Sequence, residues 1–204
     1  CLREKIMKEV FVSKSFNLIQ AKYNYNQDDQ DRIRYGLEII YITLTKLFAI
    51  LFTSLIFGTL KETIIFCLFA TGLRTFSYGI HAKKSWHCYV SSLIVFVLFP
   101  CIVISFNLTY IAKIIISVFT IISMALFAPA DTHKRPIVNS KMRKTLKIKS
   151  LVITSLYILI IFISNYNKIN NLIMLSMMAQ SIVINPITYK IFKLPYNNYK
   201  EYIN

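Results

Sequence analysis

The chain has 204 residues, of which 55% are hydrophobic, and its formal net charge is +15. Its mean hydropathy of +0.53 is too high for an ordinary soluble domain. In a soluble protein this charge would suggest a nucleic acid partner. Here the basic residues lie mostly between and outside the apolar segments, which argues against nucleic acid and for a membrane. The composition therefore predicts an all-α, polytopic integral membrane protein.

Residues 1–36 mix polar and apolar side chains and predict a cytoplasmic N-terminal arm. The apolar residues between Val10 and Tyr23 predict a short amphipathic helix on the membrane surface. The polar run 24–31 predicts a loop. A transmembrane domain over residues 37–190 and a cytoplasmic tail over 191–204 complete the predicted organisation.

Six hydrophobic segments follow the arm, and a helix needs about 20 residues to cross a bilayer. The segments cover residues 37–57, 63–80, 89–107, 109–130, 151–164 and 171–189. The second segment is interrupted by Gly72 and Arg74, among other residues, and the fifth is short. An arrangement of four spanning and two re-entrant segments is therefore the alternative to six spans.

The distribution of Lys and Arg predicts the topology. If the N-terminus is cytoplasmic and all six segments cross, cytoplasmic parts hold nineteen of these residues and the outside loops hold two. This asymmetry places both termini, and the loop near residues 81–88, on the cytoplasmic side.

A charged stretch between the second and third segments carries the chemistry, because ionisable groups at membrane depth are functional candidates. His81 and Cys88 are seven residues apart, which is about 10 Å along an unbroken helix. A thiol–imidazole pair therefore requires a turn, which Gly79 and the polar run 83–85 would permit. In such a pair imidazole takes the proton and the thiolate is the nucleophile. The alternative is a small buried cysteine and an unrelated interfacial histidine.

Gly79 and three other residues are candidates for orienting a catalytic group or holding a substrate. Arg74 could hold a substrate carbonyl or pair with an acid, or simply snorkel to the interface. Asp131, the acidic residue of a basic loop between Pro129 and Pro136, could orient a histidine, pair with Arg74, or be solvated. Ser85 is the third candidate.

The basic run 137–150 predicts a loop that binds anionic lipid and could attract an acidic peptide through Lys141, Arg143 and Lys144. A zinc site would need His81, His87, Cys88 and His133, which lack a compact ligand spacing. No metal and no cofactor are predicted.

With these residues in view, the chain resembles the accessory gene regulator B (AgrB) family. The resemblance rests on Arg74, Gly79, His81-Ala82 and Cys88, and on the stretch from Ala128 to Pro136. It implies a membrane cysteine endopeptidase of Gram-positive quorum sensing, with Cys88 as nucleophile and His81 as base.

The resemblance also implies the substrate and the product. A short precursor peptide would lose its acidic C-terminal tail, and its signal region would be held as a thioester on Cys88. An internal cysteine or serine of the peptide would then release a thiolactone or lactone ring. A homodimer is implied as well. The alternative function is a non-enzymatic small transporter or scaffold that recruits an acidic partner through the basic run.

Overall fold

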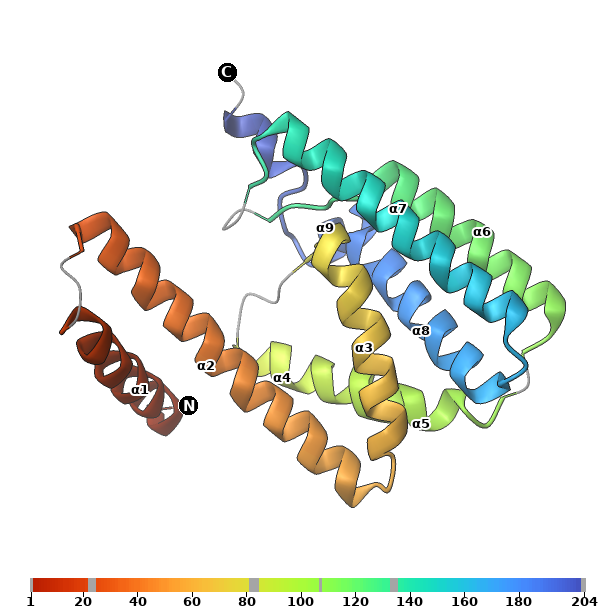
Figure 1. Cartoon of the computed structure of the whole chain (residues 1–204), viewed down its shortest axis with the longest axis horizontal. Coiled ribbons are helices and arrows are strands. Elements are labelled where there is room, and N and C mark those ends of the chain that lie inside the picture. Colours follow the sequence, from red (N-terminus) through yellow and green to blue (C-terminus); the bar gives the residue numbers. More distant parts are fainter. Residues whose placement is uncertain (1, 22–24, 81–84, 107, 133–135, 203–204) are drawn as a thin grey trace. The chain divides into compact units, whose positions relative to one another are not determined.

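The computed structural model of the chain describes residues 2–21, 25–80, 85–106, 108–132 and 136–202, and for residues 2–5 and 85–88 it describes the backbone alone (Figure 1). Within these ranges all regular elements are helical, which confirms the all-α prediction. The chain forms two compact units, Cys1–Phe52 and Thr53–Asn204.

The first unit contains α1 (Leu2–Gln20) and most of α2 (Gln27–Ile56). The loop predicted for residues 24–31 is wrong from Gln27 onward, because two aspartates in the first turn of α2 favour the helix N-terminus. An ion pair of 2.9 Å joins Lys8 to Glu38. The α1 helix buries Phe16 but exposes Leu18 and other apolar side chains, and its association with a membrane surface stays a prediction.

The second unit is built around α8 (Asn167–Ile184), in which ten of the eighteen residues are buried. Around it pack α3 (Leu60–Ser77), α5 (Phe99–Val103), α6 (Tyr110–Phe127) and α7 (Ser140–Ile163). The remaining elements are α4 (Ser85–Leu93), a π-helical turn (Ile94–Leu98), α9 (Pro186–Ile191) and a 3-10 turn (Asn198–Tyr202).

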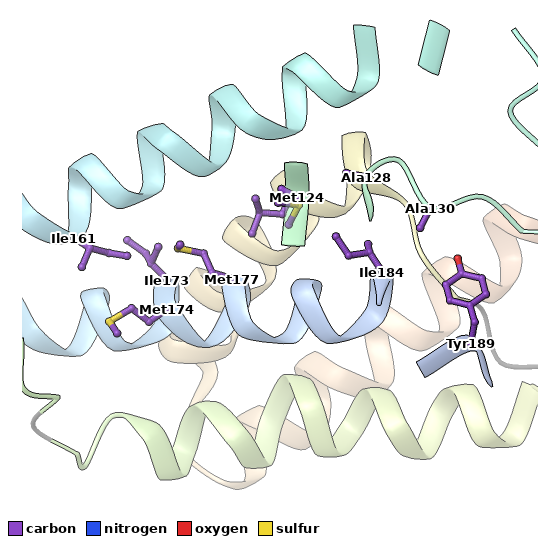
Figure 2. Close-up of a cluster of buried hydrophobic side chains, with 10 residues drawn as sticks. Met124, Ala128, Ala130, Ile161, Ile173, Met174, Met177, Ile184 and Tyr189 are labelled. Carbon is purple, nitrogen blue, oxygen red and sulfur yellow. The ribbon is translucent and has the colours of Figure 1, made fainter. Parts of the chain in front are cut away.

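Apolar side chains from several of these elements form one core in the second unit. Figure 2 shows Ile173, Met174, Met177 and Ile184 spaced along α8, with Met124 of α6 facing them. This spacing of three and four residues keeps the side chains on adjoining faces of the helix. The core thus extends along α8 to the turn where Ala128 and Ala130 lie.

The helices α3 and α7 are in close contact through Tyr157. Tyr157 of α7 donates a hydrogen bond of 3.1 Å to the carbonyl oxygen of Phe69 on α3, and the two rings pack edge to face with centroids 4.9 Å apart. The Tyr157 hydroxyl also fills the space where a side chain at Gly72 would begin. Gly72 therefore allows α3 and α7 to approach closely.

Two of the predicted segments differ in their extent. The second segment is an unbroken helix through Gly72 and Arg74, because both residues keep the helical hydrogen bonding of α3. The loop prediction for residues 137–150 is wrong from Ser140 onward, where α7 begins. The side chain of Asn139 accepts a hydrogen bond of 3.1 Å from the backbone N–H of Met142 and caps this helix.

Three described helices, α2, α6 and α7, are long and apolar enough to cross a membrane. Their apolar side chains are widely exposed, as at Ile111 (68%) and Ile163 (70%). Exposed apolar surface of this extent indicates association with a membrane or partner, and the hydropathy favours the membrane. The count of six segments and the orientation of the loops stay predictions.

Candidate functional site

The segment Tyr78–Ile80 leaves α3 and leads directly to His81. It pairs with Ala130 in a parallel bridge: the N–H of Gly79 donates to the Ala130 oxygen, and the N–H of Ala130 donates to the Ser77 oxygen, both at 2.9 Å. The N–H of Ile80 donates to the Val183 oxygen at 3.3 Å. Two chain segments remote in sequence therefore hold this backbone.

Gly79 is required by the space and by the backbone conformation. Its φ is +119°, a value that L side chains rarely adopt. A Cβ atom there would lie 2.5 Å from Cγ1 of Val183 and 3.1 Å from the Val183 oxygen. Gly79 thus lets the segment lie directly on the end of α8, which is a structural contribution to the site.

Arg74, in the last turn of α3, reaches forward along the same segment. Its Nη2 donates a hydrogen bond of 2.7 Å to the carbonyl oxygen of Ile80. Because Ile80 precedes His81, the guanidinium fixes the peptide group that enters His81. A contact of Arg74 with substrate stays a prediction.

Gln180 of α8 is buried beneath this segment, with 4% of its surface exposed. Its Nε2 donates to the Ser77 hydroxyl at 2.7 Å and to the Tyr78 carbonyl oxygen at 2.6 Å. Tyr78 itself has φ of 56° and ψ of −133°. Sequence reasoning missed Gln180, although a glutamine inside the apolar segment 171–189 is the kind of signal that marks a polar role.

Asp131 anchors the C-terminal segment. One carboxylate oxygen accepts from the backbone N–H of Asn198 at 3.0 Å and the other from that of Tyr199 at 2.8 Å. The Tyr189 hydroxyl donates to the Asp131 backbone oxygen at 2.8 Å. Burial is the main cause of the raised pKa of Tyr196, which lies in the same cluster, and the nearby Asp131 carboxylate raises this pKa further. The orienting role of Asp131 toward a histidine stays a prediction.

A basic cleft of about 280 Å³ lies where α6 ends and α7 begins. Its lining includes Arg143, Lys144 and Lys147 of α7 and the apolar residues from Leu126 to Pro129. Arg143 also stacks on Tyr199, with Cζ 3.1 Å from the ring centroid. Of the three predicted docking residues, Arg143 and Lys144 line the cleft and Lys141 does not.

The predicted catalytic pair is placed only in part. His81 lies outside the described residues. Cys88 is the fourth residue of α4, and Ser85 is the first. The joint role of His81 and Cys88, and the orienting role of Ser85, therefore stay predictions. Among the residues that the structure describes, no group of three His, Cys, Asp or Glu side chains could hold a metal ion.

Residues 12–184 match the family model described as accessory gene regulator B. An AgrB-like protein of Listeria monocytogenes is 34% identical over 198 residues, which cover 96% of this chain and 93% of the relative. An AgrB-like protein of Clostridium acetobutylicum is 36% identical, over 84% of this chain and 82% of its own length. The accessory gene regulator protein B of Staphylococcus intermedius is 29% identical, over 83% and 89%. No solved structure matches the chain.

Proposed function

The chain belongs to the accessory gene regulator B family, and from this premise we propose that it is a membrane-embedded cysteine endopeptidase that matures a quorum-sensing peptide. Family membership supports the quorum-sensing role. One observation carries the proposal furthest: Arg74, Ala130 and Val183 all hydrogen-bond the backbone that enters His81. A general base needs such a fixed approach.

In the proposed reaction the thiolate of Cys88 attacks the carbonyl carbon of the peptide bond between signal region and tail. The carbon–nitrogen bond breaks, and His81 returns the proton to the leaving amine, so that the tail departs with a new N-terminus. The signal region remains as a thioester on Cys88. The position of Cys88 near the start of α4 supports this role, because helix N-termini favour thiolates.

Ring closure would follow by a second acyl transfer. An internal thiol or hydroxyl of the bound peptide attacks the thioester carbon and forms the thiolactone or lactone, and Cys88 leaves as the thiol after protonation. Transfer to a thiol conserves the activation of the acyl group, so this route needs no added energy source. Keeping water from the thioester favours closure over hydrolysis.

The basic cleft supports docking of the acidic tail. Arg143 and Lys144 present positive charge beside the cleft, and the apolar wall from Leu126 to Pro129 would exclude water from part of the bound peptide. Charge complementarity of this kind chiefly accelerates encounter and selects the partner. Lys141, a member of the same basic run, would extend the attraction. Outside the cleft, the basic run would also bind anionic membrane lipids. We further propose a homodimer, with no nucleic acid partner.

The direct test is to trap the acyl-enzyme. Lipid-reconstituted protein is incubated with synthetic peptides that carry acidic tails, and intact mass spectrometry is used to find a hydroxylamine-sensitive adduct on Cys88. We expect the adduct in the parent protein and none in Cys88→Ala or His81→Ala, with insertion unchanged. Normal tail release by either variant would contradict the mechanism. Silent substitutions at both positions, together with loss of partner binding when Lys141, Arg143 and Lys144 are neutralised, would favour a scaffold instead.

A further inference from the structure

We propose that Gln180 is a positioning residue for the peptidase reaction, because its buried amide fixes the backbone from which His81 extends. The inference rests on the proposed function. It assigns a role in the reaction to a residue of α8, which lies outside the motif around His81 and Cys88. Gln180 lies about a hundred residues further along the chain than the segment it contacts.

The direction of its hydrogen bonds defines what Gln180 does. A carbonyl oxygen can only accept, so the amide nitrogen of Gln180 must face the Tyr78 oxygen, 2.6 Å away. The Ser77 hydroxyl donates its proton to the Leu73 oxygen at 2.7 Å and is left to accept from the same nitrogen at 2.7 Å. Both N–H groups of the amide are therefore used, and their acceptors are adjacent residues.

The two acceptors lie where α3 ends and the site segment begins. Ser77 is the last residue of α3, and Tyr78 has a positive φ of 56° without being a glycine. Residues in such sparsely populated conformations persist only when their surroundings hold them there. Gln180 supplies one such restraint from the interior of the protein, where water cannot replace its hydrogen bonds.

Release of Tyr78 would be transmitted to the catalytic base. If Tyr78 relaxes to an ordinary backbone conformation, the following peptide group rotates and carries Ile80 with it. The bonds from Arg74 to the Ile80 oxygen and from Ile80 to the Val183 oxygen would then be misaligned. His81 follows Ile80 directly in the sequence, so the inference is that a small rotation at Tyr78 reaches the proposed base. A misplacement of about 1 Å can lower a rate by roughly 100-fold.

The test compares Gln180→Leu with the matched control Ser181→Ala. Ser181 is also buried on α8, but its hydroxyl donates within its own helix, to the Met177 oxygen at 2.9 Å. The substrate is whichever synthetic acidic-tailed peptide the parent protein cleaves fastest. We expect Gln180→Leu to lower kcat by roughly 10- to 100-fold with little change in KM. Ser181→Ala is expected to keep kcat near that of the parent.

A second variant separates positioning from a general loss of stability. In Gln180→Glu the side chain can donate to the Tyr78 oxygen only when its carboxyl group is protonated. The ratio of its kcat to that of the parent should therefore rise several-fold as pH falls from about 8 to about 5.5. Taking the ratio corrects for the pH dependence that the reaction of the parent already has. Gln180→Glu also decides the matter if Gln180→Leu does not fold.

The outcomes distinguish this inference from the proposed function. Cleavage by the parent, together with a parent-like kcat in Gln180→Leu or a ratio for Gln180→Glu that stays low down to about pH 5.5, would overturn the positioning role alone. Absence of cleavage and of a Cys88 adduct in the folded parent, with every peptide, would overturn both. A lowered kcat in Gln180→Leu combined with the acid-dependent recovery of Gln180→Glu is the result that supports the inference.

Discussion

Replacing Gly79 by alanine is expected to destabilise the second unit by about 2–5 kcal/mol. Two costs contribute. A non-glycine residue at φ of +119° costs about 1–2 kcal/mol of backbone strain. The new Cβ atom would also lie 2.5 Å from Cγ1 of Val183, and such overpacking costs about 1–3 kcal/mol.

A double-mutant cycle with Val183→Ala separates the two costs. Removing the Val183 methyl groups relieves the contact with Cγ1 but leaves the φ of residue 79 and the Val183 oxygen at 3.1 Å. We expect Gly79→Ala to cost about 1–2 kcal/mol less in the Val183→Ala background than in the parent. A residual penalty from strain should remain in the double variant.

The assay is chemical unfolding in mixed micelles, followed by circular dichroism of the helices. Gly36→Ala is the matched control, because Gly36 lies within α2, has no atom within 4 Å of an added Cβ, and has no positive φ. That substitution should stabilise the protein by about 0.5–1 kcal/mol. If Gly79→Ala unfolds at the same denaturant concentration as the parent, the close approach of residue 79 to α8 is refuted.

Three further substitutions test the packing, the anchor and the cleft. Gly72→Ala should destabilise the parent, because the new Cβ atom would meet the Tyr157 hydroxyl. In a Tyr157→Phe background the same substitution should be neutral or should stabilise the protein by about 1 kcal/mol. Equal effects in both backgrounds would contradict this contact. Asp131→Asn removes the charge and replaces one of the two accepting oxygens by an NH2 group, which cannot accept a backbone N–H. A loss of about 1–3 kcal/mol should speed limited proteolysis of the C-terminal segment, and unchanged cleavage would exclude the anchor. Lys144→Gln should raise the Kd for an acidic-tailed peptide about two- to five-fold at low salt. Substitution of the exposed Lys168 by Gln should leave this Kd unchanged. Equal effects of the two substitutions would point to non-specific charge attraction.

Several features of the protein could be predicted from local sequence. The long apolar runs predicted the helices near residues 37–57 and 109–130, and the charged stretch with Arg74 and Gly79 marked the site. The positions of the helix ends were harder to predict. The basic run after Asn139 looks like a loop by its charge, but Lys and Arg are good helix formers, and the capping residue decided for a helix.

The contacts of the site could not be predicted in the same way. Nothing near Gln180 in sequence indicates that its amide meets Ser77 and Tyr78. Nothing near Asp131 indicates that its carboxylate binds the backbone of the C-terminal segment. Hydrogen-bond partners depend on which groups are desolvated together, and this follows from how the helices pack.

The sequence by itself determined that the protein is all-α with long apolar helices, because apolar runs act over each segment separately. It also predicted Gly79 and Arg74 as candidate site residues, since unusual residue types stand out locally. Only the tertiary structure decided that the end of α8 supports the backbone leading to His81, with Gln180 and Val183 as the contacts. The physical reason is that a buried polar group must find a partner that is near in space. Such a partner can be remote along the chain, and neither the apolar runs nor the charge distribution then indicates it.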